Sequence, residues 1–348
     1  MKIAIIGAGF FGTTAALKLS KSHNVDLFEK KNDILNCASK INQFRFHLGF
    51  HYPRSKKTLN EIKSSYKLFI NFYSNKVFDK TFNYYGVANK GSKISYKSYL
   101  RILKKFNLKF KITKHKFDNI SNLILTEEKV LNYFKFKQIV KRKIKQSKIN
   151  LYLNTQFTKK KIKDYDKIII CTYSANNEIL NNLLPIKIIK KNRYELVEKI
   201  LVKLPTKYKK KSYVIIDGKF VCLDPYLGTN YHLLSDVKNS KIEIIKKNKP
   251  IFKSTKRKFL DDKVHKNIKI SNFKKFIVHS QKYLPFLKHS KYVGSMFIVR
   301  ALKLNVEKTD ERTGEIHKID KKFISIFSGK WNTCVYVANK LNKLLSKK

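Results

Sequence analysis

Short apolar runs and amphipathic segments alternate at the start of the chain. The run from Lys2 to Ile6 is rich in β-branched residues, and a second apolar run covers Val25 to Phe28. Between them, the segment from Thr13 to Lys21 has apolar residues at the spacing of a helix face, namely Ala15, Ala16 and Leu19. The pattern therefore predicts a strand, a helix and a second strand.

The same two patterns recur later in the chain. Apolar residues at helical spacing fall in two further segments, at Leu59, Ile62, Tyr66, Phe69 and Tyr73, and at Tyr133, Phe136, Val140 and Ile144. Runs typical of strands cover residues 149–153, 166–172 and 323–327, and a last helix is expected over residues 332–345. We expect the run at 166–172 to lie beside the first strand in a parallel sheet.

A glycine sequence stands between the first strand and the first helix. Gly7-Ala8-Gly9-Phe10-Phe11-Gly12 has the form GxGxxG, and Glu29 ends the second strand. In such a turn the first glycine permits the sharp bend, the second lets the backbone approach a pyrophosphate, and the third lets helix and strand pack closely. An acidic residue at the position of Glu29 takes the ribose hydroxyls. The context favours a dinucleotide site, and the alternative is a purely structural glycine turn.

These patterns predict an α/β fold with two domains. A Rossmann-like domain with a parallel sheet is expected from residues 1–79, 127–182 and 294–348, and would therefore be discontinuous. An inserted mixed α+β domain that holds the substrate is expected from residues 80–126 and 183–293. The length of 348 residues and the hydrophobic content of 43% are sufficient for two cores.

The composition is strongly basic, with a formal net charge of +53. Only 8 of the 77 basic residues are arginine, and the lysines spread over the whole length. A composition bias of the source explains this spread. The alternative is an anionic partner, either RNA or a membrane surface in weak contact, with the lysine runs 159–161 and 209–211 as candidate contacts.

Other classes of protein are excluded by what the sequence lacks. No apolar run reaches the eighteen residues of a membrane span, so we expect no transmembrane segment. The four cysteines are scattered and show no metal-ligand spacing, so we expect no metal site. Such cysteine usage suits a reducing compartment, and we expect a cytoplasmic protein.

Four stretches of the chain together resemble the D-amino-acid-oxidase-like superfamily of FAD-dependent oxidoreductases, which has a glutathione-reductase-type Rossmann domain. They are the glycine turn, the loop at 38–55 with its Ala-Ser-x-x-Asn-Gln and His-x-Gly-x-His-Tyr-Pro-Arg-Ser sequences, the return strand Asp-Lys-Ile-Ile-Ile-Cys-Thr, and the terminal Ser-Gly-Lys turn. The resemblance covers the nucleotide-binding domain well and the substrate domain loosely. It implies FAD as the cofactor.

The resemblance also implies which residues hold FAD. Gly7, Gly9 and Gly12, with the amides of Phe10 and Phe11, would hold the diphosphate. Glu29 would bind the adenosine ribose, with Lys30 nearby, and Ser39, Asn42 and Gln43 would lie along the ribityl chain and the isoalloxazine ring. Gly329 and Lys330 would begin a helix whose positive end points at the flavin N1/O2 edge and stabilises the reduced flavin. For Lys330 the alternative is a solvated surface lysine.

On the substrate side, members of this superfamily hold the substrate over the flavin face with side chains of the second domain. Arg300 lies near where several of these oxidases place an arginine that grips a carboxylate. His51 is a candidate proton acceptor, with a hydrogen-bonded loop histidine as the alternative. Tyr52 and Tyr226 are candidate substrate contacts, and Tyr226 is equally compatible with a structural sheet turn. Arg312 either lies near the flavin or pairs locally with Asp310 or Glu311.

We therefore expect an FAD-dependent oxidoreductase, an oxidase or a dehydrogenase, that oxidises a C–N or C–O bond by hydride transfer to flavin N5. The expected substrate is a small polar metabolite with an anionic group, and the electron acceptor is oxygen or a quinone. One alternative is a flavoenzyme with a macromolecular anionic substrate, such as tRNA or a lipid-linked saccharide. Another is a basic nucleic-acid-binding protein with a vestigial dinucleotide fold.

Overall fold

A six-stranded sheet is assembled from segments that lie far apart in the chain. In the computed structural model, which describes residues 1–185, 190–306 and 308–346, five of these strands are parallel and β17 is antiparallel. The strand order is β17 (Glu315–Lys318), β18 (Phe323–Phe327), β10 (Lys167–Ile170), β1 (Lys2–Ile6), β2 (Asn24–Phe28) and β9 (Ile149–Tyr152). The predicted position of β10 beside β1 is confirmed.

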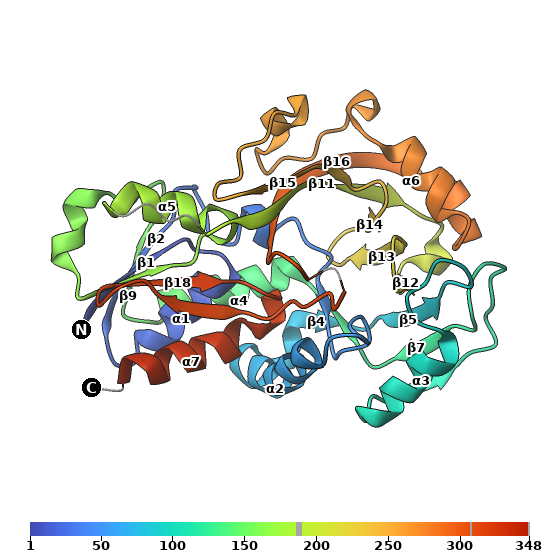
Figure 1. Ribbon diagram of the computed structural model, residues 1–348, viewed down its shortest axis with the longest axis horizontal. Coiled ribbons are helices and arrows are strands. Elements are labelled where there is room, and N and C mark those ends of the chain that lie inside the picture. Colours follow the sequence, from blue (N-terminus) through green and yellow to red (C-terminus); the bar gives the residue numbers. More distant parts are fainter. Residues whose placement is uncertain (186–189, 307, 347–348) are drawn as a thin grey trace.

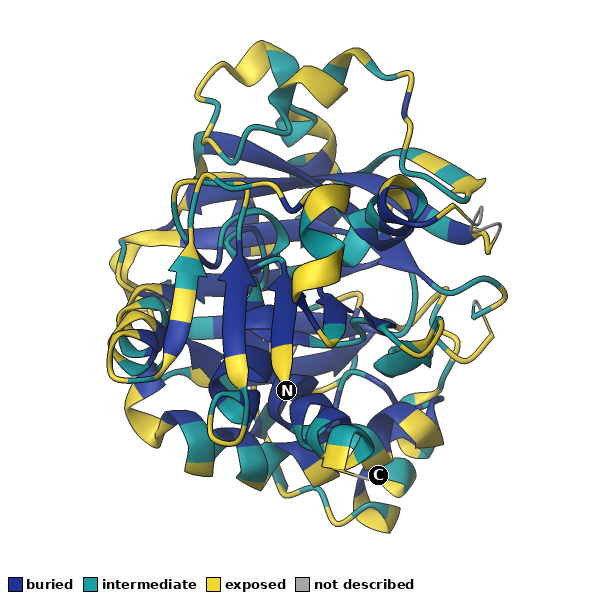
Figure 2. Cartoon of the chain, turned by 90° about the vertical axis from the view of Figure 1, so that its left-hand side faces the viewer, coloured by how far each residue is buried: buried dark blue, intermediate teal, exposed yellow. Residues whose placement is uncertain are grey.

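Successive side chains of β1 point to opposite faces of this sheet, and both faces are buried. Ile3 and Ile5 point into the larger core, and Ala4 and Ile6 point into a smaller one on the opposite face. Figure 2 shows the inner strands of this sheet dark blue over most of their length, as expected for strands covered on both sides. The larger core is covered by α1 (Phe10–Leu19), α4 (Tyr133–Lys145) and α7 (Cys334–Ser346), and α5 (Asn176–Leu183) packs on the other face.

The second sheet is larger and mostly antiparallel. Its strand order is β15 (Lys241–Lys247), β11 (Asn192–Lys203), β14 (Tyr231–Asp236), β13 (Val221–Tyr226), β12 (Lys211–Ile216), β5 (Phe82–Val87), β7 (Ile124–Thr126) and β6 (Phe110–Ile112), and β16 (Lys291–Leu302) pairs with β11. Two helices, α3 (Tyr96–Lys105) and α6 (Phe273–Ser280), pack on its opposite faces. Figure 1 shows this sheet beside the first one, with both chain ends at the far side of the parallel sheet.

Strand β16 differs from the expected domain boundary. We expected residues 294–348 in the nucleotide-binding domain, whereas the structure pairs β16 with β11 from Lys291 to Leu302 in the second sheet. Twelve-residue partners can form a long antiparallel ladder, and β16 is buried along most of that length. The chain returns to the first sheet only after Leu302, at β17.

A small sheet and a long helix join the two parts. The sheet contains β3 (Arg45–Phe46), β8 (Lys129–Leu131) and β4 (Phe78–Asp79). Helix α2 (Lys56–Tyr73) begins at the N-cap Ser55, whose hydroxyl accepts a hydrogen bond from the amide of Thr58, and it packs against α7. The loop between β2 and α2 therefore lies where the two larger sheets meet.

Candidate dinucleotide and substrate site

The turn between β1 and α1 has room only for glycine at two positions. Gly7 has a φ of +98°, and a Cβ there would lie 2.9 Å from the carbonyl oxygen of Cys171. A Cβ on Gly12 would lie 1.8 Å from the carbonyl oxygen of Gly7, well inside contact distance. The turn is therefore as tight as the GxGxxG sequence predicts.

The amino end of α1 is not capped by the side chain of its own N-cap residue. Helix α1 begins at Phe10, its N-cap Gly9 makes no side-chain cap, and no acidic residue stands in the first turn. The amide of Phe10 donates to the hydroxyl of Ser39 at 3.2 Å, and a Cβ on Gly9 would approach that hydroxyl to 3.0 Å. Unsatisfied amides beside a glycine backbone form the cradle that a diphosphate requires, so these residues fit a dinucleotide.

Glu29 stands at the end of β2, directly beside the glycine turn. Its Oε2 accepts a hydrogen bond from the amide of Ala8 at 2.8 Å, and its Oε1 accepts one from the amide of Lys31 at 3.0 Å. The residue is only partly buried, and the neighbouring Lys30 is exposed. Its carboxylate keeps further lone pairs, so Glu29 can also accept hydrogen bonds from ribose hydroxyls.

The loop after β2 brings Asn42 and Gln43 toward the second sheet. Asn42 shapes the loop, because its Oδ1 accepts a hydrogen bond from the amide of Gln43 at 2.8 Å. The side-chain amide of Gln43 donates to Oδ2 of Asp224 at 3.0 Å and to the carbonyl oxygen of Leu233 at 3.2 Å. The structure thus places both residues where the loop meets the second sheet.

A buried charge network lies next to this loop, and the sequence analysis did not identify it. Arg45 is 2% exposed, and its guanidinium lies 2.6 Å from Asp224 and 3.5 Å from Glu128. The hydroxyl of Tyr85 donates to Glu128 at 2.6 Å. Burial by itself would lower the pKa of Arg45, but Asp224, Tyr85 and Glu128 raise it. The rarity of arginine in the chain was the one signal that marked this position.

His51 and Tyr52 lie in an aromatic cluster close to Lys330. The ring centroids of His51 and Tyr52 are 4.9 Å apart, and His47 completes the cluster at 5.4 Å from His51. Nζ of Lys330 lies 4.7 Å from the centroid of the Tyr52 ring. Within the described residues, Nδ1 of His51 and the hydroxyl of Tyr52 are buried without a hydrogen-bond partner, which is the state expected of groups that meet a ligand.

Burial sets the protonation of this cluster. Desolvation, with His47 and Lys330 nearby, holds the pKa of His51 well below its usual value, so the imidazole is neutral at pH 7. Desolvation, followed by the charge of Arg312, lowers the pKa of Lys330 to about 7. Lys330 precedes the 3₁₀ turn Trp331–Thr333 that leads into α7, as the terminal motif predicts.

The two C-terminal arginines each have an acidic partner. Arg300 on β16 lies opposite Glu195 on β11, and Nη2 of Arg300 is 3.0 Å from the carboxylate. Arg312 pairs with Asp310, which is the local pairing considered above, and its Nη1 is buried without a partner among the described residues. Both arginines lie within electrostatic range of Lys330.

Three of these side chains combine desolvation with access to solvent. Arg300 is 34% exposed at its side chain, and His51 and Lys330 are only partly buried. Yet burial is the leading cause of the lowered pKa of His51 and of Lys330. It also acts to lower the pKa of Arg300. Side chains that are surrounded by protein and still partly accessible to water are typical of the lining of a recess.

Tyr226 lies in a different environment. It ends β13, opposite Tyr231 in the β13–β14 hairpin, and its ring stacks on Phe44 with centroids 5.8 Å apart. It is 6% exposed and also contacts Phe134. Of the two possibilities that the sequence left open, this packing is that of a structural tyrosine.

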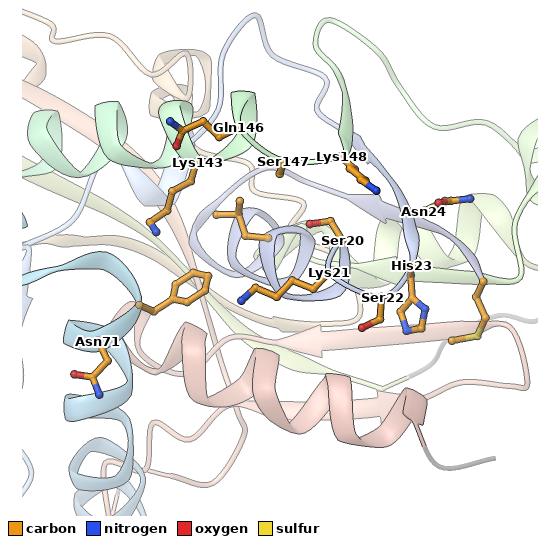
Figure 3. A pocket seen from close by; sticks show the side chains of 13 residues that line it. Ser20, Lys21, Ser22, His23, Asn24, Asn71, Lys143, Gln146, Ser147 and Lys148 are labelled. Atoms are coloured by element: carbon orange, nitrogen blue, oxygen red, sulfur yellow. The ribbon is translucent and has the colours of Figure 1, made fainter.

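One surface hollow among the described residues lies away from the glycine turn. It has a volume of about 780 Å³ and is lined by residues that precede β1 and β2 or end α1, α2 and α4, among them Lys21, Lys143 and Lys148. Figure 3 shows these lysines around the C-terminal end of α1. The cofactor of a parallel sheet binds at the carboxyl ends of the strands, which is the opposite edge.

Two negative findings apply to residues 1–185, 190–306 and 308–346. No group of His, Cys, Asp and Glu side chains there could hold a metal ion, and the four cysteines are free. In the same part of the chain, no helix combines the length and apolar character that crossing a bilayer requires.

Comparison with known proteins agrees with this geometry at the amino-terminal end. The model of the NAD(P)-binding Rossmann-like domain matches residues 5–65. The FAD-dependent monooxygenase FPY4 of Fusarium mangiferae is 34% identical over 102 residues, which are 29% of this chain and 28% of that protein. The chain thus matches little more than a quarter of the length of this relative.

Solved structures extend the similarity to the whole chain. L-proline dehydrogenase from P. horikoshii has a TM-score of 0.72 at 14% identity and covers 99% of this chain and 93% of its own. L-α-glycerophosphate oxidase from Mycoplasma pneumoniae with FAD bound has a TM-score of 0.72 at 13% identity, covering 100% and 95%. The chain therefore has a Rossmann-like dinucleotide-binding domain and the fold of the FAD-dependent oxidases and dehydrogenases, as its motifs predicted.

Proposed function

We propose that this protein is an FAD-dependent oxidoreductase that oxidises a C–N or C–O bond of a small polar, anionic metabolite. The observation that carries the proposal is the cluster of His51, Tyr52 and Lys330, in which buried polar atoms lack partners where the loop after β2, the start of α7 and the second sheet meet. Orphaned polar atoms of this kind are costly unless a ligand completes their hydrogen bonds.

The dinucleotide would be held as the glycine turn requires. Gly7, Gly9 and Gly12 let the backbone approach the diphosphate, the amides at the start of α1 donate to it, and Glu29 accepts from the ribose hydroxyls. Asn42 and Gln43 come from the loop that continues toward the second sheet. The flavin ring would then lie near the His51–Lys330 cluster.

When bound, FAD supplies a hydride acceptor at N5. The protein must then remove the proton from the amine or hydroxyl on the carbon that is oxidised. His51 is suited to this step because its imidazole is neutral at pH 7 and its Nδ1 has no partner among the described residues. Lys330 and the amino end of the helix that follows it would supply positive charge that stabilises the reduced flavin.

The anionic character of the substrate is supported by the excess of cations in this part of the molecule. Lys330, Arg300 and Arg312 lie within electrostatic range of one another, whereas Asp310 is the one carboxylate among the groups that most affect Lys330. Arg300 can contact a substrate with the part of its guanidinium that Glu195 leaves free. Tyr52 can donate from its hydroxyl.

A monooxygenase reaction is a second candidate, because curated relatives that match part of the sequence carry that name. That similarity covers 102 residues, which are 29% of this chain and 28% of the relative. The fold comparison, which covers 99–100% of the chain, favours the oxidase or dehydrogenase reaction. Oxygen consumption without incorporation of oxygen into the product would separate the two.

The first experiment is an absorption spectrum of the purified protein, followed by acid release of the bound cofactor. We expect stoichiometric FAD. Anaerobic mixing with sets of amino acids, hydroxy acids and their neutral amides should then bleach the flavin with at least one acid. A protein that is colourless and takes up no added FAD would contradict the proposal.

The R300M variant tests the substrate side, with R193M as its matched control, since both arginines bind Glu195. We expect R300M to lose affinity for acidic substrates and R193M to retain it. Equal KM and kcat in the two variants across acidic substrates would remove Arg300 from the substrate site.

A further inference from the structure

A lysine lies buried in the second sheet where it meets the loop after β2. Lys199, in the middle of β11, is 7% exposed. Its Nζ donates to the hydroxyl of Ser235 at 2.8 Å and to Oε1 of Gln43 at 3.3 Å. Among the residues that the structure describes, no carboxylate lies within 4 Å of this ammonium group.

The three neighbouring arginines are each paired with a carboxylate. Arg45 binds Asp224, Arg300 binds Glu195, and Arg312 binds Asp310. Asp224 is the carboxylate whose charge acts on the pKa of Lys199. It already accepts hydrogen bonds from Arg45, Ser212 and Gln43. Lys199 is therefore left without a counter-ion.

An ammonium group without a counter-ion is expensive in a protein interior, where the penalty amounts to several kcal/mol. Burial accordingly lowers the pKa of Lys199 to about 8, with Arg300 acting in the same direction. Apolar residues precede and follow it on the same face, Val197 and Leu201, and Met296 lies opposite on β16. A methionine would satisfy this environment, so the charged group requires another explanation.

The position of Lys199 indicates what its partner is. Side chains alternate along β11, so Lys199 shares a face with Glu195, and Arg300 stands on the same face of β16. Gln43 reaches this face from the loop after β2. Lys199 and Lys330 both lie within electrostatic range of the thiol of Cys222, which places the two lysines around one region of the site.

We propose that Lys199 binds the carboxylate group of the substrate, with the hydroxyl of Ser235 beside it as a second polar contact. A carboxylate fits better than a phosphate, because one ammonium group supplies a single compensating charge. Arg300 stays paired with Glu195 and can add a further contact to the substrate with the part of its guanidinium that Glu195 leaves free. The proposal rests on the proposed function and names the group in this site that recognises the anion.

The test measures binding of propanoate, of its neutral counterpart propanamide, and of inorganic phosphate to the purified holoprotein by isothermal titration calorimetry. Wild-type protein should bind propanoate and not propanamide. In K199M the affinity for propanoate should fall on the order of thirtyfold or more, as when one partner of a buried charge pair is removed. The control K203M changes an exposed lysine of the same strand and should bind as wild type does.

Further variants keep the test decisive. K199Q removes the charge with less change in polarity. If K199M does not fold, K199Q takes its place in the test and should show the same loss of affinity. Unchanged propanoate affinity in K199M or K199Q, or a loss confined to R300M, would overturn the proposal, as would binding of phosphate in preference to propanoate. The calorimetric signal does not depend on flavin. A protein without flavin therefore refutes the proposed function, whereas a flavoprotein whose Lys199 variants bind normally refutes this inference alone.

Discussion

The amide of Ala8 donates a hydrogen bond to the carboxylate of Glu29 at 2.8 Å, which ties the glycine turn after β1 to the end of β2. Two residues separated by 21 positions are thus joined at the edge of the sheet where a dinucleotide binds. Glu29 holds the turn, and in the proposed function it also binds the ribose. Replacing it should affect both, and the two effects can be measured separately.

The E29Q variant should bind FAD more weakly. The amide keeps one acceptor oxygen but loses the charge, and a hydrogen bond to a charged group contributes about 1.5–3 kcal/mol. We therefore expect the Kd for FAD to rise roughly tenfold to a hundredfold, measured by quenching of flavin fluorescence on titration of the apoprotein. E127Q, at an exposed position, is the control and should bind normally. An unchanged Kd in E29Q would show that Glu29 serves the turn alone.

The two glycines of the turn should respond differently to alanine. In G12A the new Cβ meets backbone, at 1.8 Å from the carbonyl oxygen of Gly7, so we expect poor folding or a large loss of Tm. In G9A it meets the hydroxyl of Ser39 at 3.0 Å, so the Tm of the apoprotein should change little while FAD affinity falls. The double variant G9A/S39A restores the space but not the approach of the diphosphate, and it removes the hydrogen bond from the amide of Phe10 to Ser39. Its Tm should therefore fall below that of G9A, and a recovery of full FAD affinity would contradict the proposed diphosphate site.

Removal of the Arg45 side chain should be strongly destabilising. R45M would leave Asp224 and Glu128 buried without their cation, and breaking such a buried pair costs about 3–5 kcal/mol. We expect a large decrease in the urea midpoint. R101M removes an exposed arginine of α3 and should leave the midpoint unchanged. Similar midpoints for the two variants would mean that the network adds no stability.

Lys330 should make flavin reduction depend on pH. Burial lowers its pKa to about 7, so the amine is charged below this pH and neutral above it. Loss of the charge in K330M should make the flavin midpoint potential more negative by roughly 20–40 mV, about 1–2 kcal/mol for a two-electron couple. The difference from wild type should be largest near pH 6 and vanish by about pH 9.

The matched control for this prediction is K340M, which removes an exposed lysine from the same helix. Its midpoint potential should follow that of wild type at every pH. If the midpoint potential of K330M equals that of wild type at pH 6, Lys330 acts through its packing over Tyr52 and not through its charge.

Much of the nucleotide-binding domain could be predicted because its signals are local. The glycine turn depends on backbone angles and on the space of a single Cβ at Gly7 and Gly12, which residue type alone decides. The strands β1, β2, β10 and β18 are short apolar runs with little competing helical pattern. The discontinuity of the domain followed from recognising β10 as a buried strand.

The substrate side depended on contacts that no local pattern contains. Arg300 was predicted to bind a substrate carboxylate, and the sequence did not predict that it lies across from Glu195, a pairing set by the β11–β16 register. The same pairing with β11 makes β16 a strand of the second sheet. Tyr226 was a candidate substrate contact. Its ring stacks on Phe44, which lies 182 residues away in the chain, so no local sequence pattern could show this contact.

The sequence by itself determined the dinucleotide turn, the parallel strands around it and the FAD-dependent oxidoreductase fold class, because backbone freedom and hydrophobic period are properties of neighbouring residues. Only the tertiary structure decided which charges are paired. Arg45, Arg300 and Arg312 each meet a carboxylate, and Lys199 does not. Electrostatic energy depends on distance and burial in three dimensions, so the partner of a charged residue emerges only when distant segments pack together.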